Sequence, residues 1–135
     1  MQDESRKEDQ AAIEELIQRA RDLIAERQEE GRHHIAAAVR TATGRTFAAV
    51  HLEATVGRVA VCAEAVALGM AAAAGDTELL LVVAVDRKGE VVSPCGMCRE
   101  LISDYAPNAR LVVPTSVGLM PVPVMHLLPN KHKRA

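Results

Sequence analysis

Two stretches decide the fold, residues 62–85, CAEAVALGMAAAAGDTELLLVVAV, and residues 93–105, SPCGMCRELISDY. The first stretch joins a run of good helix formers, residues 62–74, to the continuous aliphatic run Leu79–Val85. Such an aliphatic run is typical of a central strand that is covered on both faces. The second stretch predicts a helix over 96–105, because the proline before it suits a first helical turn. Helix, strand and helix in succession indicate an α/β fold.

The flanking segments extend this pattern. Apolar residues at helical spacing predict an amphipathic first helix, and a Thr-Gly-Arg turn between two apolar segments predicts a β-hairpin. The elements predicted there are a helix over 7–29, hairpin strands over 35–41 and 46–53, a strand over 110–113 and a final helix over 122–128 limited by Pro129. We therefore expect a three-layer α/β/α sandwich with a mixed sheet. We expect one domain over residues 1–135, with flexible ends at 1–6 and 131–135.

The composition excludes several classes of function. The chain has 135 residues, a net charge of −2, and Phe47 and Tyr105 as its only aromatic residues. A platform for stacking single-stranded nucleic acid needs several aromatics, and duplex binding needs a broad basic surface, so we expect no nucleic-acid partner. The charged first thirty residues hold no signal-peptide core, and the longest low-polarity segment, residues 59–74, is too short to span a membrane. Three cysteines are an odd number for a disulfide framework, so we expect a cytoplasmic protein without a membrane partner.

All three cysteines lie at predicted helix starts. Cys62 begins one helix, and Cys95 and Cys98 begin the next. Cysteines three residues apart share a helix face and can bind one ion together, with Cys62 as a third thiolate. Structural zinc sites use four protein ligands, whereas catalytic zinc keeps one position open. Three thiolates therefore predict one catalytic Zn²⁺ per subunit, and the alternative is a redox-active or incidental Cys-x-x-Cys pair.

Glu64 follows Cys62 by two residues. It need not bind the metal, but it can reach a water molecule that the metal makes acidic, and a carboxylate there can shuttle the proton. Three thiolates and Zn²⁺ sum to −1, and the positive ends of the two helices partly offset that charge. The alternative for Glu64 is a carboxylate that only favours the helix N-terminus.

These two motifs, Cys62-Ala63-Glu64 and Pro94-Cys95-Gly96-Met97-Cys98-Arg99, resemble those of the zinc nucleoside deaminases, in particular the cytidine deaminase and blasticidin-S deaminase branch. The similarity extends from about residue 33 to residue 129. The resemblance implies a five-stranded sheet in the α/β/α sandwich. It also implies a homotetramer, or a homodimer, with active sites near the subunit interfaces.

The resemblance also implies roles for individual residues. Cys62, Cys95 and Cys98 become the zinc ligands, and Glu64 becomes the proton shuttle of a hydrolytic deamination. The backbone of Ala63 and Cys95 would hold the polar edge of the ring, and the carbonyl of Ser93 would face the leaving ammonia.

Some positions depart from the cytidine pattern. His51 stands where that family carries the Asn of a ribose-binding Asn-x-Glu pair, whereas Glu53 is retained, and His33 aligns with an aromatic that packs on the pyrimidine. Ala65 stands where an Arg often offsets the thiolate charge, and Arg99 or Arg58 could compensate. The aromatic that often follows the position of Pro129 is missing, and the alanine-rich run after Ala65 is more like the blasticidin-S branch.

The sequence thus predicts a zinc-dependent hydrolase that acts on a small aminopyrimidine. The first candidate reaction is conversion of cytidine or deoxycytidine to the uridine product with release of ammonia. The alternatives are deamination of blasticidin S or another small aminopyrimidine, and a non-catalytic, zinc-stabilised oligomeric binding protein. An intact Glu64 favours an enzyme, since a scaffold does not need it.

Overall fold

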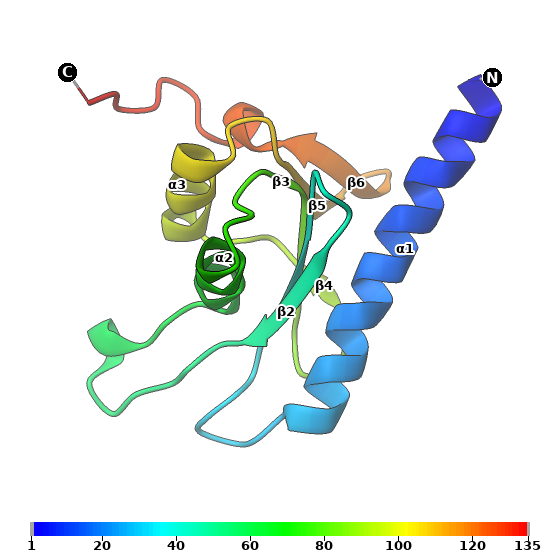
Figure 1. Ribbon diagram of the computed structural model, residues 1–135. Coiled ribbons are helices and arrows are strands. Elements are labelled where there is room, and N and C mark those ends of the chain that lie inside the picture. Colours follow the sequence, from blue (N-terminus) through cyan, green and yellow to red (C-terminus); the bar gives the residue numbers. More distant parts are fainter. Residues whose placement is uncertain (1, 135) are drawn as a thin grey trace.

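The computed structural model describes residues 2–134, and it shows a mixed β-sheet between two layers of helices (Figure 1). The helices are α1 (Gln2–Arg27), α2 (Ala63–Ala73) and α3 (Gly96–Tyr105), with short 3₁₀ turns η1 (Gly57–Val59) and η2 (Val124–Leu127). The strands are β1 (Ala36–Thr41), β2 (Thr46–Val50), β3 (Leu79–Val85), β4 (Val91–Val92), β5 (Arg110–Thr115) and β6 (Gly118–Pro123). The expected α/β/α sandwich with a mixed sheet is confirmed.

The sheet runs in the order β2-β1-β3-β5-β6, and the two-residue β4 pairs with β3 outside this path. Strand β1 is antiparallel to both β2 and β3, β3 is parallel to β5, and β5 is antiparallel to β6. The central strand β3 is the aliphatic run that the sequence marked as covered on both faces, and all of its residues except Leu80 are buried.

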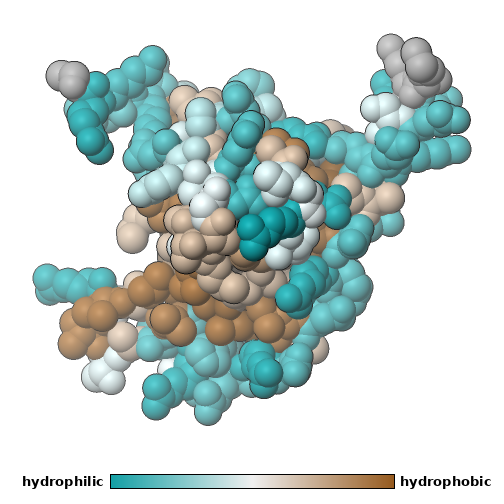
Figure 2. Space-filling view, viewed as in Figure 1, coloured by the Kyte–Doolittle hydropathy of each residue, from teal (hydrophilic) through white to brown (hydrophobic). Residues whose placement is uncertain are grey.

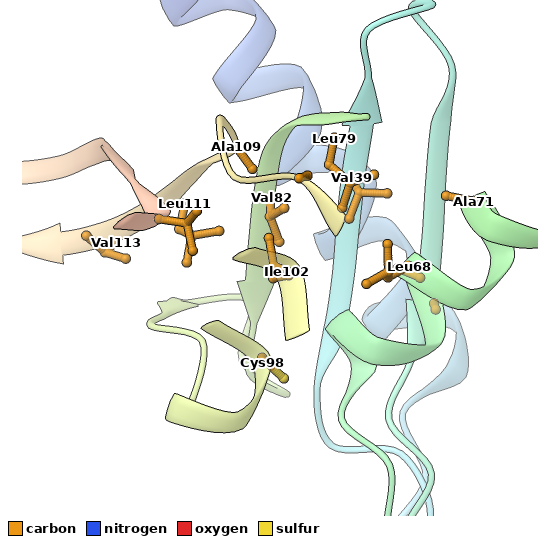
Figure 3. Packing of buried hydrophobic residues seen from close by; sticks show 14 residues of the cluster. Val39, Leu68, Ala71, Leu79, Val82, Cys98, Ile102, Ala109, Leu111 and Val113 are labelled. Atoms are coloured by element: carbon orange, nitrogen blue, oxygen red, sulfur yellow. The ribbon is translucent and has the colours of Figure 1, made fainter. Parts of the chain in front are cut away.

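Different helices cover the two faces of the sheet. Helix α1 packs Leu16, Ile17, Ala20 and Ile24 against one face. Helices α2 and α3 cover the other face, where Leu68 and Ile102 meet strand residues such as Val82 (Figure 3). Cys98 belongs to this second core, so the helix that carries two of the cysteines is fixed by apolar burial.

Some boundaries differ from the prediction. Helix α1 begins at Gln2 rather than at residue 7 and stops at Arg27 rather than at residue 29. The expected flexibility of residues 1–6 and 131–135 stays a prediction. At the other end, Lys131 lies against α3, where its Nζ is 2.5 Å from a carboxylate oxygen of Asp104. Residues 1 and 135 of the expected flexible ends lie outside the described residues.

The predicted final helix over residues 122–128 is wrong. Residues 118–123 form the edge strand β6, and only residues 124–127 make a short 3₁₀ turn. A strand at the edge of a sheet has one unpaired side, so Pro121 and Pro123 are tolerated there although they lack an N–H group. The two-residue strand β4 was not predicted either. In the part of the chain that the structure describes, we find no helix of the length and apolarity that a membrane span requires.

Candidate active site

The predicted motifs meet at one end of the sheet. Ala36 at the start of β1 pairs with Val50 at the end of β2 and with Val85 at the end of β3. The chain passes from β2 into His51 and from β4 into Ser93, and both residues line one cavity together with the first residues of α2. The sheet topology therefore brings segments that are far apart in sequence to the helix N-termini.

The three cysteines form one cluster. Cys62 and Cys95 are the N-cap residues of α2 and α3, and Cys98 lies in the first turn of α3. Their sulfur atoms all lie within 4.8 Å of one another, and the Sγ atoms of Cys62 and Cys95 are 3.7 Å apart. Zinc–sulfur bonds of 2.3 Å at tetrahedral angles place two sulfurs about 3.8 Å apart. Within residues 2–134, this is the one group of three or more Cys, His, Asp or Glu side chains close enough to share a metal ion.

The electrostatics of the cluster also fit a cation. Cys98 is only 2% exposed, and burial raises the pKa of its thiol, an effect to which the nearby Glu64 carboxylate adds. A buried thiolate beside a carboxylate therefore needs positive charge, which a divalent ion supplies directly and the two helix N-termini supply in part. The donor set, the spacing and the charge all suit Zn²⁺.

Glu64 lies in the first turn of α2 and faces the same cavity. Its side chain is 5% exposed, and burial raises the pKa of its carboxyl above the usual value. A carboxyl whose pKa is moved towards neutrality can both accept and return a proton. Beside it, Ala63 packs on Ala37 and Ala84, and these small side chains let the start of α2 approach the sheet closely.

The cavity has a volume of about 220 Å³. Six of the nine residues that the sequence marked as site residues line it: Cys62, Ala63, Glu64, Ser93, Cys95 and His51. The rest of its wall is apolar and comes from Ile35, Ala60, Val61 and Val92. These four residues were not predicted, because nothing in an isolated aliphatic residue marks it as part of a pocket. The pair Val91-Val92 before Ser93 was a signal for the missed β4.

Three predicted residues lie outside this lining. Cys98 is buried and faces a neighbouring hollow shared with Cys62. Glu53 lies beside His51, with its Oε2 atom 3.8 Å from Nε2 of the imidazole. His33 lines a separate cavity next to Leu23, and its Nδ1 donates a hydrogen bond of 2.8 Å to the backbone carbonyl of His51.

Arg99 is the arginine that the structure holds beside the cysteine cluster. Its Nε donates a hydrogen bond of 2.9 Å to the carbonyl of Pro94, the residue directly before Cys95. The other candidate, Arg58, is exposed in η1. Of the two arginines considered, Arg99 is therefore the one that contacts the residue next to a cysteine, and its compensation of the thiolate charge stays a prediction.

Several apolar side chains near the starts of α2 and α3 are exposed. Val56, Val59 and Val61 before α2 and Met97 at the start of α3 are 38–76% exposed. Figure 2 shows hydrophobic residues gathered in the lower part of this face, from the η1 segment towards the base of α2.

Known proteins resemble this chain in sequence and in fold. Residues 10–114 match the cytidine and deoxycytidylate deaminase zinc-binding region. Over 128 residues the chain is 44% identical to a blasticidin-S deaminase of Bacillus cereus, a match that covers 89% of this chain and 91% of that protein. A crystal structure of cytidine deaminase from Mycobacterium leprae superposes with a TM-score of 0.75 at 26% identity and covers 87% of this chain and 97% of that one. The corresponding structure from Burkholderia pseudomallei gives a TM-score of 0.73 at 25% identity, with 88% and 98% covered.

Proposed function

Because the chain belongs to the cytidine and deoxycytidylate deaminase family with its zinc-binding region, we propose that it hydrolyses the exocyclic amine of a small 4-aminopyrimidine and releases ammonia. The observation that carries this proposal is one cavity that holds Glu64 beside Cys62 and Cys95. The cavity, at about 220 Å³, is smaller than the roughly 300–1,000 Å³ of pockets for drug-sized ligands. It suits a pyrimidine ring with the rest of the substrate towards the mouth. Residues 1–135 would act as one deaminase domain.

Each of the site residues has a distinct role in this proposal. Cys62, Cys95 and Cys98 hold the zinc ion, which when bound acts as a Lewis acid and makes a water molecule more acidic. The buried carboxylate of Glu64 would take one proton from that water and give it to the ring nitrogen. It would then carry the second proton of the same oxygen to the amine, which leaves as ammonia while the oxygen becomes the carbonyl of the product. The backbone N–H groups of Ala63 and Cys95 hold the polar edge of the ring, and the Ser93 carbonyl accepts a hydrogen bond from the leaving ammonia. The apolar wall excludes bulk water.

Two substrates are favoured by different observations. The identity of 44% with a blasticidin-S deaminase and the His51 ring at the pocket wall favour blasticidin S. Glu53 beside His51, together with the cytidine deaminase structures at 25–26% identity, favours cytidine or deoxycytidine. A non-catalytic binding protein is disfavoured, because a buried carboxylate at the pocket has a free-energy cost that binding alone does not require.

The exposed apolar side chains near the starts of α2 and α3 support assembly of several copies. A second copy that covers Val59, Val61 and Met97 would bury them and close the mouth of the cavity, as a homotetramer or homodimer allows. A reducing, cytoplasmic environment would keep the three thiols available for zinc.

An ammonia-release assay across cytidine, deoxycytidine, cytosine and blasticidin S tests the proposal, on protein with measured zinc content. We expect one zinc per chain and turnover of at least one nucleoside-like substrate. Zinc-loaded protein that releases no ammonia from any of the four would contradict the proposed activity and favour the binding protein.

A further inference from the structure

His51 is held by backbone groups of the segment between α1 and β1. Its Nδ1 atom accepts hydrogen bonds from the backbone N–H of His34, at 2.7 Å, and of Ile35, at 3.2 Å. Both amides are donors, so Nδ1 must carry a lone pair, and in a neutral imidazole the ring hydrogen then lies on Nε2. The backbone therefore selects one tautomer of this ring.

The main chain of His51 contacts the same segment. Its N–H donates to the carbonyl of Ile35 at 3.0 Å, and its carbonyl accepts from Nδ1 of His33 at 2.8 Å. One residue thus makes four hydrogen bonds to residues 33–35. Ile35 lines the candidate cavity, so these hydrogen bonds hold part of the cavity wall in place.

A second imidazole has a related role in this segment. The rings of His34 and His51 lie 5.3 Å apart, and Nε2 of His34 accepts the N–H of Gly31 at 2.9 Å. Residues 31–35 connect α1 to the ladder of β1, and three of their backbone amides are satisfied by imidazole nitrogens. In this segment, neutral histidine rings accept the backbone N–H hydrogen bonds that carbonyl groups accept in a helix or a sheet.

We propose that His51 is a positioning residue that works as the neutral imidazole with its hydrogen on Nε2: Nδ1 fastens residues 34–35 to the end of β2 and keeps Ile35 in the cavity wall. The same tautomer leaves a hydrogen on Nε2, and this nitrogen lies 3.8 Å from Oε2 of Glu53. That separation is too long for a direct hydrogen bond, and one hydroxyl or water oxygen between the two atoms can accept from Nε2 and donate to the carboxylate. Only this last contact rests on the proposed function.

The two hydrogen bonds that Nδ1 of His51 accepts from the backbone of His34 and Ile35 are here called the clamp. Acid is expected to break the clamp, because a proton on Nδ1 would face two N–H donors. Burial is the main cause that lowers the pKa of His51 from its ordinary 6.5, the charges of His34 and His33 also lower it, and Glu53 opposes them. The unfolded chain therefore takes up the proton at a higher pH than the folded chain. The contribution of the clamp to stability is complete above about pH 6.5 and is lost as the pH falls through the lowered value.

The tautomer can be measured on the unaltered, zinc-loaded protein. Long-range ¹H–¹⁵N correlation spectra of histidine-labelled protein at pH 7.5 separate protonated from unprotonated ring nitrogens, and the His51 signals are those missing from the His51→Asn spectrum. We expect an unprotonated Nδ1 and a protonated Nε2. A hydrogen on Nδ1, or averaging between the two tautomers, would overturn the proposal without any need for a substrate.

Two substitutions separate the functions of the ring nitrogens. The amide oxygen of Asn, like Nδ1 of His, is attached directly to Cγ, so His51→Asn keeps an acceptor for the two backbone amides. The amide of Gln lies one bond further out, so His51→Gln keeps a donor near the place of Nε2 and loses the acceptor. Amide exchange at His34 and Ile35 should quicken about fivefold or more in the Gln variant and stay close to wild type in the Asn variant. Exchange that is equally fast, or unchanged, in both variants would contradict the clamp.

The exposed His132, in the C-terminal segment, provides the matched control, and His132→Asn should leave every readout unchanged. Given deaminase activity, lowering the pH through the titration of His51 should raise KM several-fold, while protonation of Glu64 acts on kcat. The same acid effect on KM should be weaker in His51→Asn, and an equal effect would count against the clamp. If no substrate is deaminated at all, the proposed function fails while the tautomer and exchange results still decide the role of His51.

Discussion

The metal side and the substrate side of the candidate cavity are built in different ways. On the metal side, Cys62, Glu64 and Cys95 lie in or next to the first turns of two helices that are fixed to the sheet by buried apolar residues. On the substrate side, His51 and Ile35 lie just outside the strands and depend on hydrogen bonds between side chains and backbone. Helices packed on the sheet hold the metal-binding and proton-transferring groups. The cavity wall that would distinguish substrates comes from connecting segments, whose sequence and conformation vary more easily.

Removal of a thiol from the metal side should have the largest effect. Cys95→Ser leaves two thiols and a weaker oxygen donor, so zinc affinity should fall by more than about 100-fold and deaminase activity should disappear with the metal. Zinc content after dialysis and thermal unfolding would measure this loss. Met97→Ala is the matched control, since Met97 lies in the same turn, is 76% exposed and should leave zinc content unchanged. Full zinc content in Cys95→Ser would show that the three-thiol site is wrong.

Two glutamates allow a direct comparison of the sides. Glu64→Gln should keep zinc and fold but lower kcat by about 10³–10⁴-fold or more, because an amide cannot take up and return the proton. Glu53→Gln should act mainly on KM, by several-fold, because Glu53 lies beside the cavity next to His51. Steady-state kinetics on both variants measures the difference. Turnover by Glu64→Gln within about tenfold of wild type would remove Glu64 from the mechanism.

Substitutions on the substrate side alone should change the preference between substrates. We expect His51→Asn to raise kcat/KM for cytidine relative to blasticidin S by several-fold, about the free energy of one hydrogen bond, because the imidazole is bulkier than Asn at a position that favours a sugar hydroxyl. Both substrates must be measured on both proteins. An unchanged or lowered cytidine preference would mean that His51 does not set selectivity for the sugar.

A change far from both sides should have the smallest effect. Asp9 of α1 binds Arg110 of β5 through contacts of 2.6 and 3.1 Å, and the hydrogen bond from Arg110 lowers the pKa of the Asp9 carboxyl below its ordinary 3.8. Asp9→Asn should cost less than about 1 kcal/mol of unfolding free energy at pH 7, since both side chains are more than one-third exposed.

The pH dependence of this pair has a definite sign. The lowered pKa means that the Asp9 contribution is present above pH 3.8 and is lost as the pH falls through the lowered value. The stability difference between wild type and Asp9→Asn should therefore shrink in acid, as denaturant unfolding at pH 7 and near pH 3 would measure. Activity at pH 7 should not change, and a loss of activity would show that α1 influences the site.

Much of the fold could be predicted because its signals are local. The aliphatic run of β3 and the helix α3 were predicted with the bounds that the structure shows, 79–85 and 96–105. Helix α2 differs from the prediction by one residue at each end, since Cys62 and Ala74 are its caps. Strand β6 was missed, because Pro121 and Pro123 argue against a strand unless one knows that the strand lies at the sheet edge with a free side.

The sequence by itself was enough to predict the chemistry of the metal side. Three cysteines and one glutamate in two short motifs at helix starts indicate a zinc ion and a proton shuttle, because ligand type and helical spacing are local properties. Only the tertiary structure decided that Ile35 and Val92 form the cavity wall, that Glu53 lies beside His51, and that His33 faces another cavity. It also decided the hydrogen position on His51, because a tautomer follows from the backbone groups around the ring, and those groups come together only when β1 pairs with β2.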